Sequence, residues 1–269
     1  MNALPLCFNV KMKGLIKMTN IVICGANGHM GRVIADVISG REDCKVIAGI
    51  DKFTTAYADF PIVASAGELT EKPDVIIDFS HPSTLDELLN YCLSNGTALV
   101  IGSTGYNEEQ TAKIKKAAEQ IPLFFTFNMS LGINLLADLA KRATKILGDQ
   151  FDIEIVEKHH NQKLDAPSGT AIMLANAINE ELDNRCSYTY DRHSVRAKRT
   201  KNEIGMHSIR GGTIVGEHEI IFAGRDEVVS LKHEAHSKSV FGVGAVNAAV
   251  FLSGKPAGLY AMGDMLKED

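Results

Sequence analysis

The chain has 269 residues, 45% of them hydrophobic, which is enough to bury one large core or two modest ones. Its net charge of -5, its pI near 6.0 and the lack of a long basic run argue against a nucleic-acid-binding surface. No apolar run is long enough to span a bilayer, so we expect no membrane partner and a small molecule as the ligand.

The cysteines and the N-terminal residues indicate in which cellular compartment the protein resides. The five cysteines lie far apart, without a C-x-x-C pair, and several fall in apolar runs typical of buried thiols. This distribution predicts a reducing, cytoplasmic location. Residues 1–17 are mildly basic and apolar but lack the hydrophobic core and cleavage site of a signal peptide. We interpret them as an N-terminal extension that precedes the fold.

The first predicted elements are a β-branched strand over 20–24, a glycine-rich turn and an apolar helical pattern. This order is the context of a dinucleotide-binding fingerprint, although the glycines here are spaced G-x-x-G-x-x-G. The alternative is a flavodoxin-like or nucleotide-free α/β turn. We expect the turn to bind a dinucleotide cofactor through Gly25, Asn27, Gly28, His29, Met30, Gly31 and Arg32.

An acidic residue follows the next predicted strand, residues 46–50. Asp51 lies twenty positions beyond Gly31, where a carboxylate is expected to accept hydrogen bonds from the adenosine ribose hydroxyls. Lys52 comes directly after it. Both Lys52 and Arg32 are candidates to bind a 2′-phosphate.

Three further apolar runs, at 75–79, 99–101 and 123–127, read as buried strands of a parallel sheet. Each run ends in small or polar residues. Because the carboxyl ends of parallel strands meet at one edge, we expect these residues to line one cleft with the glycine turn, although each alone is also an ordinary turn former. They are Ser80, Gly102, Ser103, Thr104, Asn128 and Met129.

The pattern changes after a helix predicted at 133–147. Strand-like runs at 151–156, 203–209, 213–222 and 227–233 enclose one strong helix, 171–182, which indicates an α+β unit with a mixed or antiparallel sheet. We interpret the polar residues 184–202 as a solvated loop. The apolar helix at 240–252 is expected to pack back on the first unit.

The predicted fold class is therefore α/β, a Rossmann-like doubly wound parallel sheet plus a second α+β domain with a mixed sheet. We expect residues 18–129 and 240–269 to form the dinucleotide-binding domain. Residues 130–239 would then form the second, substrate-binding domain.

Residues 157–171, EKHHNQKLDAPSGTA, hold the densest chemistry in the chain. His159, His160 and Lys163 offer proton-carrying or cationic side chains, and Ser168 opens a helical pattern. A helix start presents free backbone N–H groups to an anion, so the segment pairs an anion site with proton donors. The alternative is that both histidines merely end a buried strand and the lysine is solvated.

A second histidine pair, His233 and His236, raises the question of a metal. A zinc pair on a helix prefers spacing of four and a third ligand, whereas this pair is spaced by three at the end of a strand, so we expect no metal. A metallohydrolase that uses His159, His160, His233 and His236 remains an alternative, as does a non-catalytic NAD(P)-binding sensor. Lys238 nearby is a candidate anion contact.

Several motifs together resemble one enzyme family, 4-hydroxy-tetrahydrodipicolinate reductase, also called dihydrodipicolinate reductase. They are GANGHMGR at 25–32, IGSTG at 101–105, NMSLG at 128–132, EKHHNQKLDAPSGTA at 157–171 and GGTIVGEHEIIF at 211–222. The resemblance runs from about Met18 to the C-terminus and implies reduction of a cyclic dicarboxylate by NADH or NADPH in lysine and diaminopimelate biosynthesis, with release of water.

The resemblance also implies roles for residues. His159 is similar to the family's acid/base histidine and Lys163 to its proton donor. His160, Ser168, Gly169 and Thr170 would bind substrate carboxylates, and Lys238 stands where many relatives have arginine.

Asp51 and Lys52 stand where some relatives have a Glu-Arg pair, and Met129 stands where the family's Asn-Phe-Ser motif usually has phenylalanine. We expect use of both NADH and NADPH, and the resemblance implies a homotetramer in which residues 130–239 form the oligomerisation domain. Another nicotinamide oxidoreductase of the same plan, acting on an amino or keto dicarboxylate, is the nearest alternative.

Overall fold

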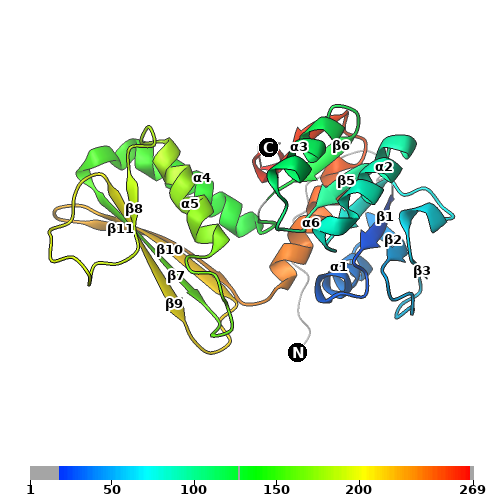
Figure 1. Ribbon diagram of the computed structural model, residues 1–269, viewed down its shortest axis with the longest axis horizontal. Coiled ribbons are helices and arrows are strands. Elements are labelled where there is room, and N and C mark those ends of the chain that lie inside the picture. The colour runs from blue at the N-terminus through cyan, green and yellow to red at the C-terminus, as the bar shows by residue number, and fades with distance from the viewer. Residues whose placement is uncertain (1–17, 127, 267–269) are drawn as a thin grey trace.

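The computed structural model describes residues 18–126 and 128–266, which form two lobes, each built on its own β-sheet (Figure 1). The predicted extension, residues 1–17, lies outside the described residues. Among the helices of the described part, none is long and apolar enough to cross a membrane.

The sheet of the first lobe has seven strands in the order β12-β6-β5-β4-β1-β2-β3, and all of its strand pairs are parallel. The chain reverses its direction of travel at β1, which pairs with β2 on one side and β4 on the other. Ligands of open parallel sheets bind at such a switch point. The strands are β1 (Thr19–Cys24), β2 (Cys44–Ile50), β3 (Ile62–Val63), β4 (Val75–Asp78), β5 (Ala98–Ile101), β6 (Pro122–Phe125) and β12 (Gly258–Tyr260).

Helices cover both faces of this sheet, which explains why its strands are apolar on both sides. In β1, Ile21 and Ile23 pack in one core with α1 (His29–Ser39) and α6 (Ser239–Leu252). Val22 and Cys24 face the other core with α2 (Leu85–Asn95) and α3 (Glu108–Ala117). Helix α6 is apolar around most of its circumference because it lies against both α1 and strands β4, β5 and β6.

The sheet of the second lobe has five strands in the order β11-β10-β7-β9-β8. Strand β7 pairs antiparallel with β10 and parallel with β9, so the sheet is mixed. Together with the parallel sheet of the first lobe, this confirms the predicted fold class. The strands are β7 (Asp152–His159), β8 (Ser187–Thr189), β9 (Glu203–Arg210), β10 (Gly216–Ala223) and β11 (Val228–Ala235).

Two helices, α4 (Leu131–Leu147) and α5 (Gly169–Glu180), pack on one face of the second sheet (Figure 1). The burial of β7 alternates, so Ile153 and Ile155 enter the core under these helices while Glu154 and Val156 face the other side. Short elements complete the fold: η1 (Ala66–Glu68), η2 (Pro82–Thr84), η3 (Gly148–Gln150) and α7 (Met262–Met265).

The segment predicted as a solvated loop, 184–202, is more ordered than expected. Residues Ser187–Thr189 form the edge strand β8 beside β9. Arg192 donates to Glu154 at 2.7 Å and to Glu203 at 2.5 Å, and Arg199 donates to Glu154 at 3.0 Å. The loop prediction was wrong for Ser187–Thr189 alone, since residues 190–202 form no helix or strand and are mostly exposed. The ion pairs join residues far apart in the chain, which local polarity does not reveal. Strand β12 was likewise not predicted.

Candidate active site

The turn between β1 and α1 is built so closely that two of its glycines, Gly25 and Gly31, have no room for a side chain. A Cβ on Gly25, whose φ is +81°, would lie 2.7 Å from the carbonyl oxygen of Phe79 at the end of β4. A Cβ on Gly31 would lie 2.2 Å from the carbonyl oxygen of Gly25. The turn therefore passes directly over the switch point, and α1 begins against it.

The start of α1 is open to an anion. Gly28 is the N-cap and makes no side-chain capping hydrogen bond, and His29 and Met30 are the first residues of the helix. The first backbone N–H groups of a helix have no partner within it and carry positive partial charge. A phosphate group fits this position.

Asp51 at the end of β2 is joined to the turn. One carboxylate oxygen accepts a hydrogen bond from the backbone N–H of Asn27 at 2.9 Å, and the other accepts one from Phe53 at 3.0 Å. Arg32 donates to the side chain of Asn27 at 2.8 Å. The fold thus brings together three predicted cofactor residues, while Lys52 is exposed beside the ring of Phe53.

Arg32 also stacks on an aromatic ring. Its guanidinium carbon lies 4.2 Å from the centre of the Tyr57 ring. Such stacking holds the cation at the mouth of the turn while leaving part of its face to solvent.

A buried carboxylate that the sequence analysis did not single out holds the ends of β4 and β5. Asp78 accepts hydrogen bonds from the hydroxyl of Ser80 at 2.5 Å, from the backbone N–H of Ser80 at 3.0 Å and from the hydroxyl of Tyr106 at 3.1 Å. Burial, followed by the charge of Asp78, raises the pKa of Tyr106. Asp78 was the one charged residue of the predicted apolar strand 75–79, and a charge within such a run was the available signal.

The predicted residues after β5 lie close to this group. A Cβ on Gly102 would meet the ring of Phe79 at 2.2 Å, so the two strand ends are in contact. Ser103 is buried and Thr104 is exposed. The strand ends therefore meet at one edge, as the sequence pattern indicated.

Asn128 connects the two lobes. Its side-chain amide donates to the hydroxyl of Thr170 at 2.9 Å, and its side-chain oxygen accepts from the N–H of Ser130 at 2.8 Å. The side-chain amide of Asn134 in α4 donates to the backbone carbonyl of Asn128 at 2.9 Å. Asn128 follows β6, and Thr170 lies in the first turn of α5, so a predicted cofactor residue contacts a predicted substrate residue. Met129 beside it is buried.

On the second lobe, the inward-facing end of β7 carries Glu157 and His159. Glu157 is 1% exposed. It accepts hydrogen bonds from His159 Nδ1 at 2.5 Å, from both terminal nitrogens of Arg210 at 2.7 and 2.9 Å, and from the N–H of Ser168 at 3.2 Å. Burial alone would raise the pKa of Glu157, but the hydrogen bonds, led by that of Arg210, lower it to about 2. Glu157 is therefore ionised.

Burial lowers the pKa of His159 below its ordinary value, and the hydrogen bond and charge of Glu157 offset this in part. The second histidine of the motif, His160, is half-buried, and its carbonyl oxygen accepts a hydrogen bond from the N–H of Lys163 at 3.1 Å. The two adjacent histidines thus have different surroundings.

Another buried histidine, His218 on β10, was missed by the sequence analysis. Its ring centre lies 5.2 Å from that of His159, and its Nε2 is 3.1 Å from the hydroxyl of Ser168. Burial, followed by the charge of His159, lowers the pKa of His218 to about 3. The available signal was the alternation of side chains along the strand. Gly216, His218 and Ile220 lie two positions apart and all point inward.

The segment before α5 already holds a carboxylate. The ammonium group of Lys163 lies 2.8 Å from Asp165, and this ion pair, with a contribution from the backbone N–H of Gly169, holds the pKa of Asp165 below its ordinary value. Ser168 caps α5 by accepting from the N–H of Ala171 at 3.2 Å. The predicted anion site therefore has the donors that a carboxylate requires.

The remaining candidates lie apart from these contacts. Lys238, the residue before α6, is exposed and forms no ion pair within the described part of the chain. His233 packs on Gly132, where a Cβ would meet its ring at 2.6 Å, and His236 is 86% exposed. Among residues 18–126 and 128–266, no group of three side chains is arranged to hold a metal ion.

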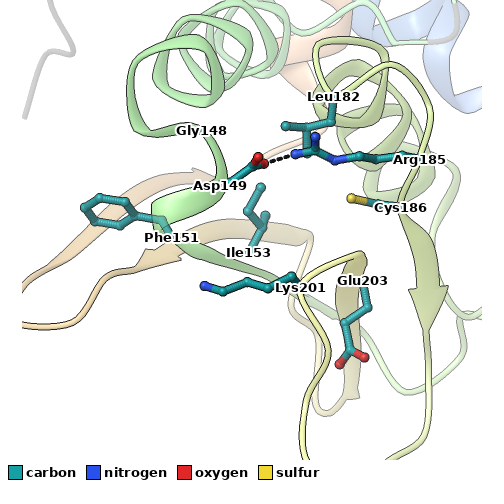
Figure 2. Close-up of a pocket in the computed structure, with 9 residues that line it drawn as sticks. All are labelled: Gly148, Asp149, Phe151, Ile153, Leu182, Arg185, Cys186, Lys201 and Glu203. Atoms are coloured by element: carbon teal, nitrogen blue, oxygen red, sulfur yellow. Dashed lines mark ion pairs between the residues drawn. The ribbon is translucent and has the colours of Figure 1, made fainter.

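Two cavities lie elsewhere. A groove of about 580 Å³ runs beside α1, and of the predicted site residues only Arg32 lines it. A cavity of about 10 Å³ lies under the end of α4, where Asp149 and Arg185 form an ion pair (Figure 2). Neither contains the histidines or Lys163.

Comparison with known proteins gives one consistent result. Residues 19–129 match the family model for the N-terminus of dihydrodipicolinate reductase, and residues 132–266 match that for its C-terminus. A 4-hydroxy-tetrahydrodipicolinate reductase from Clostridium tetani is 46% identical over 93% of this chain and 97% of its own length. Another, from Caldanaerobacter subterraneus subsp. tengcongensis, is 47% identical over 93% of this chain and 99% of its own length.

Comparison with solved structures agrees with the family match. A dipicolinate-bound dihydrodipicolinate reductase from Paenisporosarcina sp. TG-14 superimposes with a TM-score of 0.76, at 27% identity over 91% of this chain and 97% of that one. A DAP dehydrogenase from C. glutamicum in complex with DAP gives a TM-score of 0.56 at 10% identity over 93% and 96%, which is a likeness of fold alone.

Because His218 is buried, we predict that the free energy of unfolding depends on pH. Its pKa is about 3 in the folded chain against an ordinary 6.5, so the unfolded chain binds more protons and stability falls as the pH drops below about 6.5. For one such group the slope approaches about 1.4 kcal/mol per pH unit. We expect His218→Gln to be less sensitive than the natural chain between about pH 6.5 and pH 5, as measured by urea unfolding.

The pKa values of His159 and His233 are also lowered, so some slope should remain in this variant. Identical slopes in the two proteins would contradict the neutral, buried state of His218.

Proposed function

The chain belongs to the dihydrodipicolinate reductase family, and from this premise we propose that its Glu157–Ala171 segment and glycine turn perform the family's reaction with the roles given below. The chain is an NAD(P)H-dependent oxidoreductase of lysine and diaminopimelate biosynthesis. It converts 4-hydroxy-tetrahydrodipicolinate to tetrahydrodipicolinate and water, and the balanced reaction consumes one NAD(P)H and one proton.

The contact between Asn128 and Thr170 is the observation that carries the assignment of roles. It joins the cofactor edge of the first sheet to the start of α5, at 2.9 Å between the two side chains. The substrate-side donors of α5 are therefore tied to the same edge as the glycine turn. A reaction between a bound cofactor and a bound substrate requires this juxtaposition.

The glycine turn fits a dinucleotide. Gly25 and Gly31 let the turn pack tightly against the end of β4 and the start of α1, where a Cβ would clash, and the uncapped start of α1 offers N–H groups for the pyrophosphate. Asp51 would accept hydrogen bonds from the ribose hydroxyls, and Arg32 with Lys52 would accommodate a 2′-phosphate. When bound, the reduced nicotinamide supplies a hydride to C4 of the substrate.

The substrate is a dicarboxylate, and Lys163 and the start of α5 supply cationic and N–H donors for it. These donors now hold Asp165, which supports their fitness for a substrate carboxylate. The dipicolinate-bound relative supports the same ligand class. We assign carboxylate binding to His160, Ser168, Gly169 and Thr170. Lys238 is a further candidate on the sequence pattern alone.

Proton delivery falls to Lys163 and His159 in this proposal. Lys163 carries a proton in its ammonium form and lies on a short loop beside the helix start, so it would donate that proton to the reduced substrate. His159 would exchange a proton at the ring nitrogen that is not bound to Glu157. Its lowered pKa favours the neutral ring near pH 7.

The central test of these roles is Lys163→Ala. Loss of a general acid typically slows turnover by roughly 10²- to 10⁴-fold, and we expect that loss with NADH affinity unchanged, because Lys163 belongs to the second lobe. The assay follows NADH and NADPH oxidation with enzymatically generated substrate, and NADH binding is measured by calorimetry.

Lys141→Ala is the matched control, because Lys141 forms a similar ion pair, 2.7 Å to Glu180, away from the site. It should keep normal turnover. An equal loss of cofactor affinity in Lys163→Ala would contradict the proposed division between the lobes. Turnover of an amino or keto dicarboxylate in place of the named substrate would favour the alternative oxidoreductase.

The second test concerns the cofactor. We propose that both NADH and NADPH are used, with Asp51 favouring NADH, because its carboxylate accepts from ribose hydroxyls and repels a 2′-phosphate. Hydrogen bonds to charged groups contribute about 1.5 to 3 kcal/mol, so Asp51→Ala should weaken NADH binding by roughly tenfold or more and NADPH binding less. The dissociation constants of both cofactors measure this, and the reverse order would refute the ribose contact.

We also propose a homotetramer formed through the second sheet. The face opposite α4 and α5 presents Val156, Ile209 and Ile221, and Ile209 is 46% exposed. No helix of the described chain packs on that face (Figure 1). These apolar side chains stand among charged ones on the same face, including Glu154, Lys158 and Glu217, so a partner chain would meet a mixed apolar and charged surface.

Light scattering should give four times the chain mass of 29.2 kDa, and Ile209→Asp should reduce it. Ile146→Asp, at a residue that is 73% exposed on α4, should leave the mass unchanged. A single-chain mass for the natural protein would contradict the proposal. The free thiols of Cys24, Cys44 and Cys92 support a reducing cytoplasm as the compartment, which cell fractionation tests.

A further inference from the structure

Glu157 has no assigned role in the proposed reaction, yet it makes the most hydrogen bonds of any carboxylate near the site. Its two oxygens accept from His159, from both terminal nitrogens of Arg210 and from the backbone N–H of Ser168. Three elements therefore converge on one buried carboxylate: β7, β9 and the start of α5.

The ionisation of Glu157 determines where His159 carries its proton. An ionised carboxylate can only accept hydrogen bonds, so the contact of 2.5 Å requires an N–H on Nδ1 of His159. In the neutral ring, Nε2 is then left without a proton. Nε2 lies beside Gly216, where a Cβ would be 3.2 Å away, so the absence of a side chain there leaves this nitrogen room.

Arg210 links this pair to the loop that carries Lys163. Besides its two hydrogen bonds to Glu157, its Nη2 donates to the backbone carbonyl of Asp165 at 2.6 Å. Asp165 in turn is the ion-pair partner of Lys163. The arginine therefore holds both proton-carrying residues of the site in one network.

We propose that Glu157, held by Arg210, is a positioning residue for the reduction: it keeps His159 in the Nδ1–H tautomer and ties that ring to the start of α5. Nε2 of His159 is then the atom that exchanges a proton with the substrate. This inference rests on the proposed function of the site. Glu157 acts through His159 and has no need to touch the substrate.

The charged and titratable groups around His159 come from every neighbouring element. Glu157 lies on its own strand, Arg210 comes from β9, His218 from β10, and Lys163 from the loop that follows β7. Only Glu157 among these favours the protonated ring. Removing its charge should therefore lower the pKa of His159.

The test is Glu157→Gln in the full-length protein. A side-chain amide can donate or accept, so the tautomer is no longer enforced. Loss of a residue that orients a catalytic histidine costs roughly 10- to 100-fold or more in activity, and we expect kcat to fall by that factor while the dissociation constant of NADH is unchanged. The limb of the pH profile that reports His159 should move to lower pH.

Long-range ¹H–¹⁵N correlation of the imidazoles provides a readout without turnover. We expect the Nδ1–H tautomer for His159 in the natural protein and a mixture in Glu157→Gln. Glu157→Asp, which keeps the charge on a shorter arm, should recover part of the activity and keep the pH limb nearer its natural position. An Nε2–H tautomer in the natural protein would overturn the proposal, even if the Gln variant failed to fold.

Glu154→Gln is the matched control. Glu154 lies on the same strand but the opposite face, and it also binds a histidine, His207 at 2.7 Å, and two arginines. It should leave the pH limb and the tautomer of His159 unchanged. A natural pH limb and kcat in Glu157→Gln, or an equal shift in Glu154→Gln, would refute the role of Glu157. Absence of reductase turnover in the natural protein would instead refute the proposed function, because the tautomer measurement remains valid without it.

Discussion

The buried charge of Glu157 is the constraint on which the second lobe depends. An ionised carboxylate with almost no exposure costs several kcal/mol unless it is paired and its oxygens are fully hydrogen-bonded. Arg210 from β9, His159 from β7 and the N–H of Ser168 meet that requirement. The packing of β7, β9 and the start of α5 around this carboxylate therefore stabilises the lobe and fixes the position of His159 at the same time.

The first lobe is governed by a steric constraint instead. The turn after β1 lies so close to the end of β4 and to its own helix that only glycine fits at Gly25 and Gly31. That close approach brings the uncapped start of α1 to the switch point of the sheet. Asp51 and Asp78 then hold the neighbouring loops by accepting backbone and hydroxyl hydrogen bonds. These contacts shape the edge that we propose for the cofactor.

Each cation of the proposed substrate side is already paired with a carboxylate. Lys163 lies against Asp165 and Arg210 against Glu157, so the charges of these four side chains balance. A substrate carboxylate would be held by the donors that now hold Asp165, which are Lys163 and the N–H of Gly169, at short distances and in spite of the chain's net charge of -5. Neutral His218 beneath Ser168 adds a hydrogen-bond partner without adding charge, because burial keeps its pKa at about 3.

The sequence by itself determined the local features. Apolar runs ending in glycine or polar residues predicted β1, β4, β5 and β6, because strand and turn preferences act over a few neighbours. The EKHHNQKLDAPSGTA segment predicted the helix start at Ser168 in the same local way and supplied His159 and Lys163 as proposed site residues, and its resemblance to a known family named the reaction.

Only the tertiary structure decided which distant residues meet. Arg210 lies 53 positions from Glu157, His218 lies 50 from Ser168, and Asn128 lies 42 from Thr170. The edge strand β8 and the Asp78–Tyr106 contact were missed in the same way. Strand register and helix packing bring these pairs together, and neither can be read from the residues on each side of a position, since each depends on how all the elements bury their apolar faces at once.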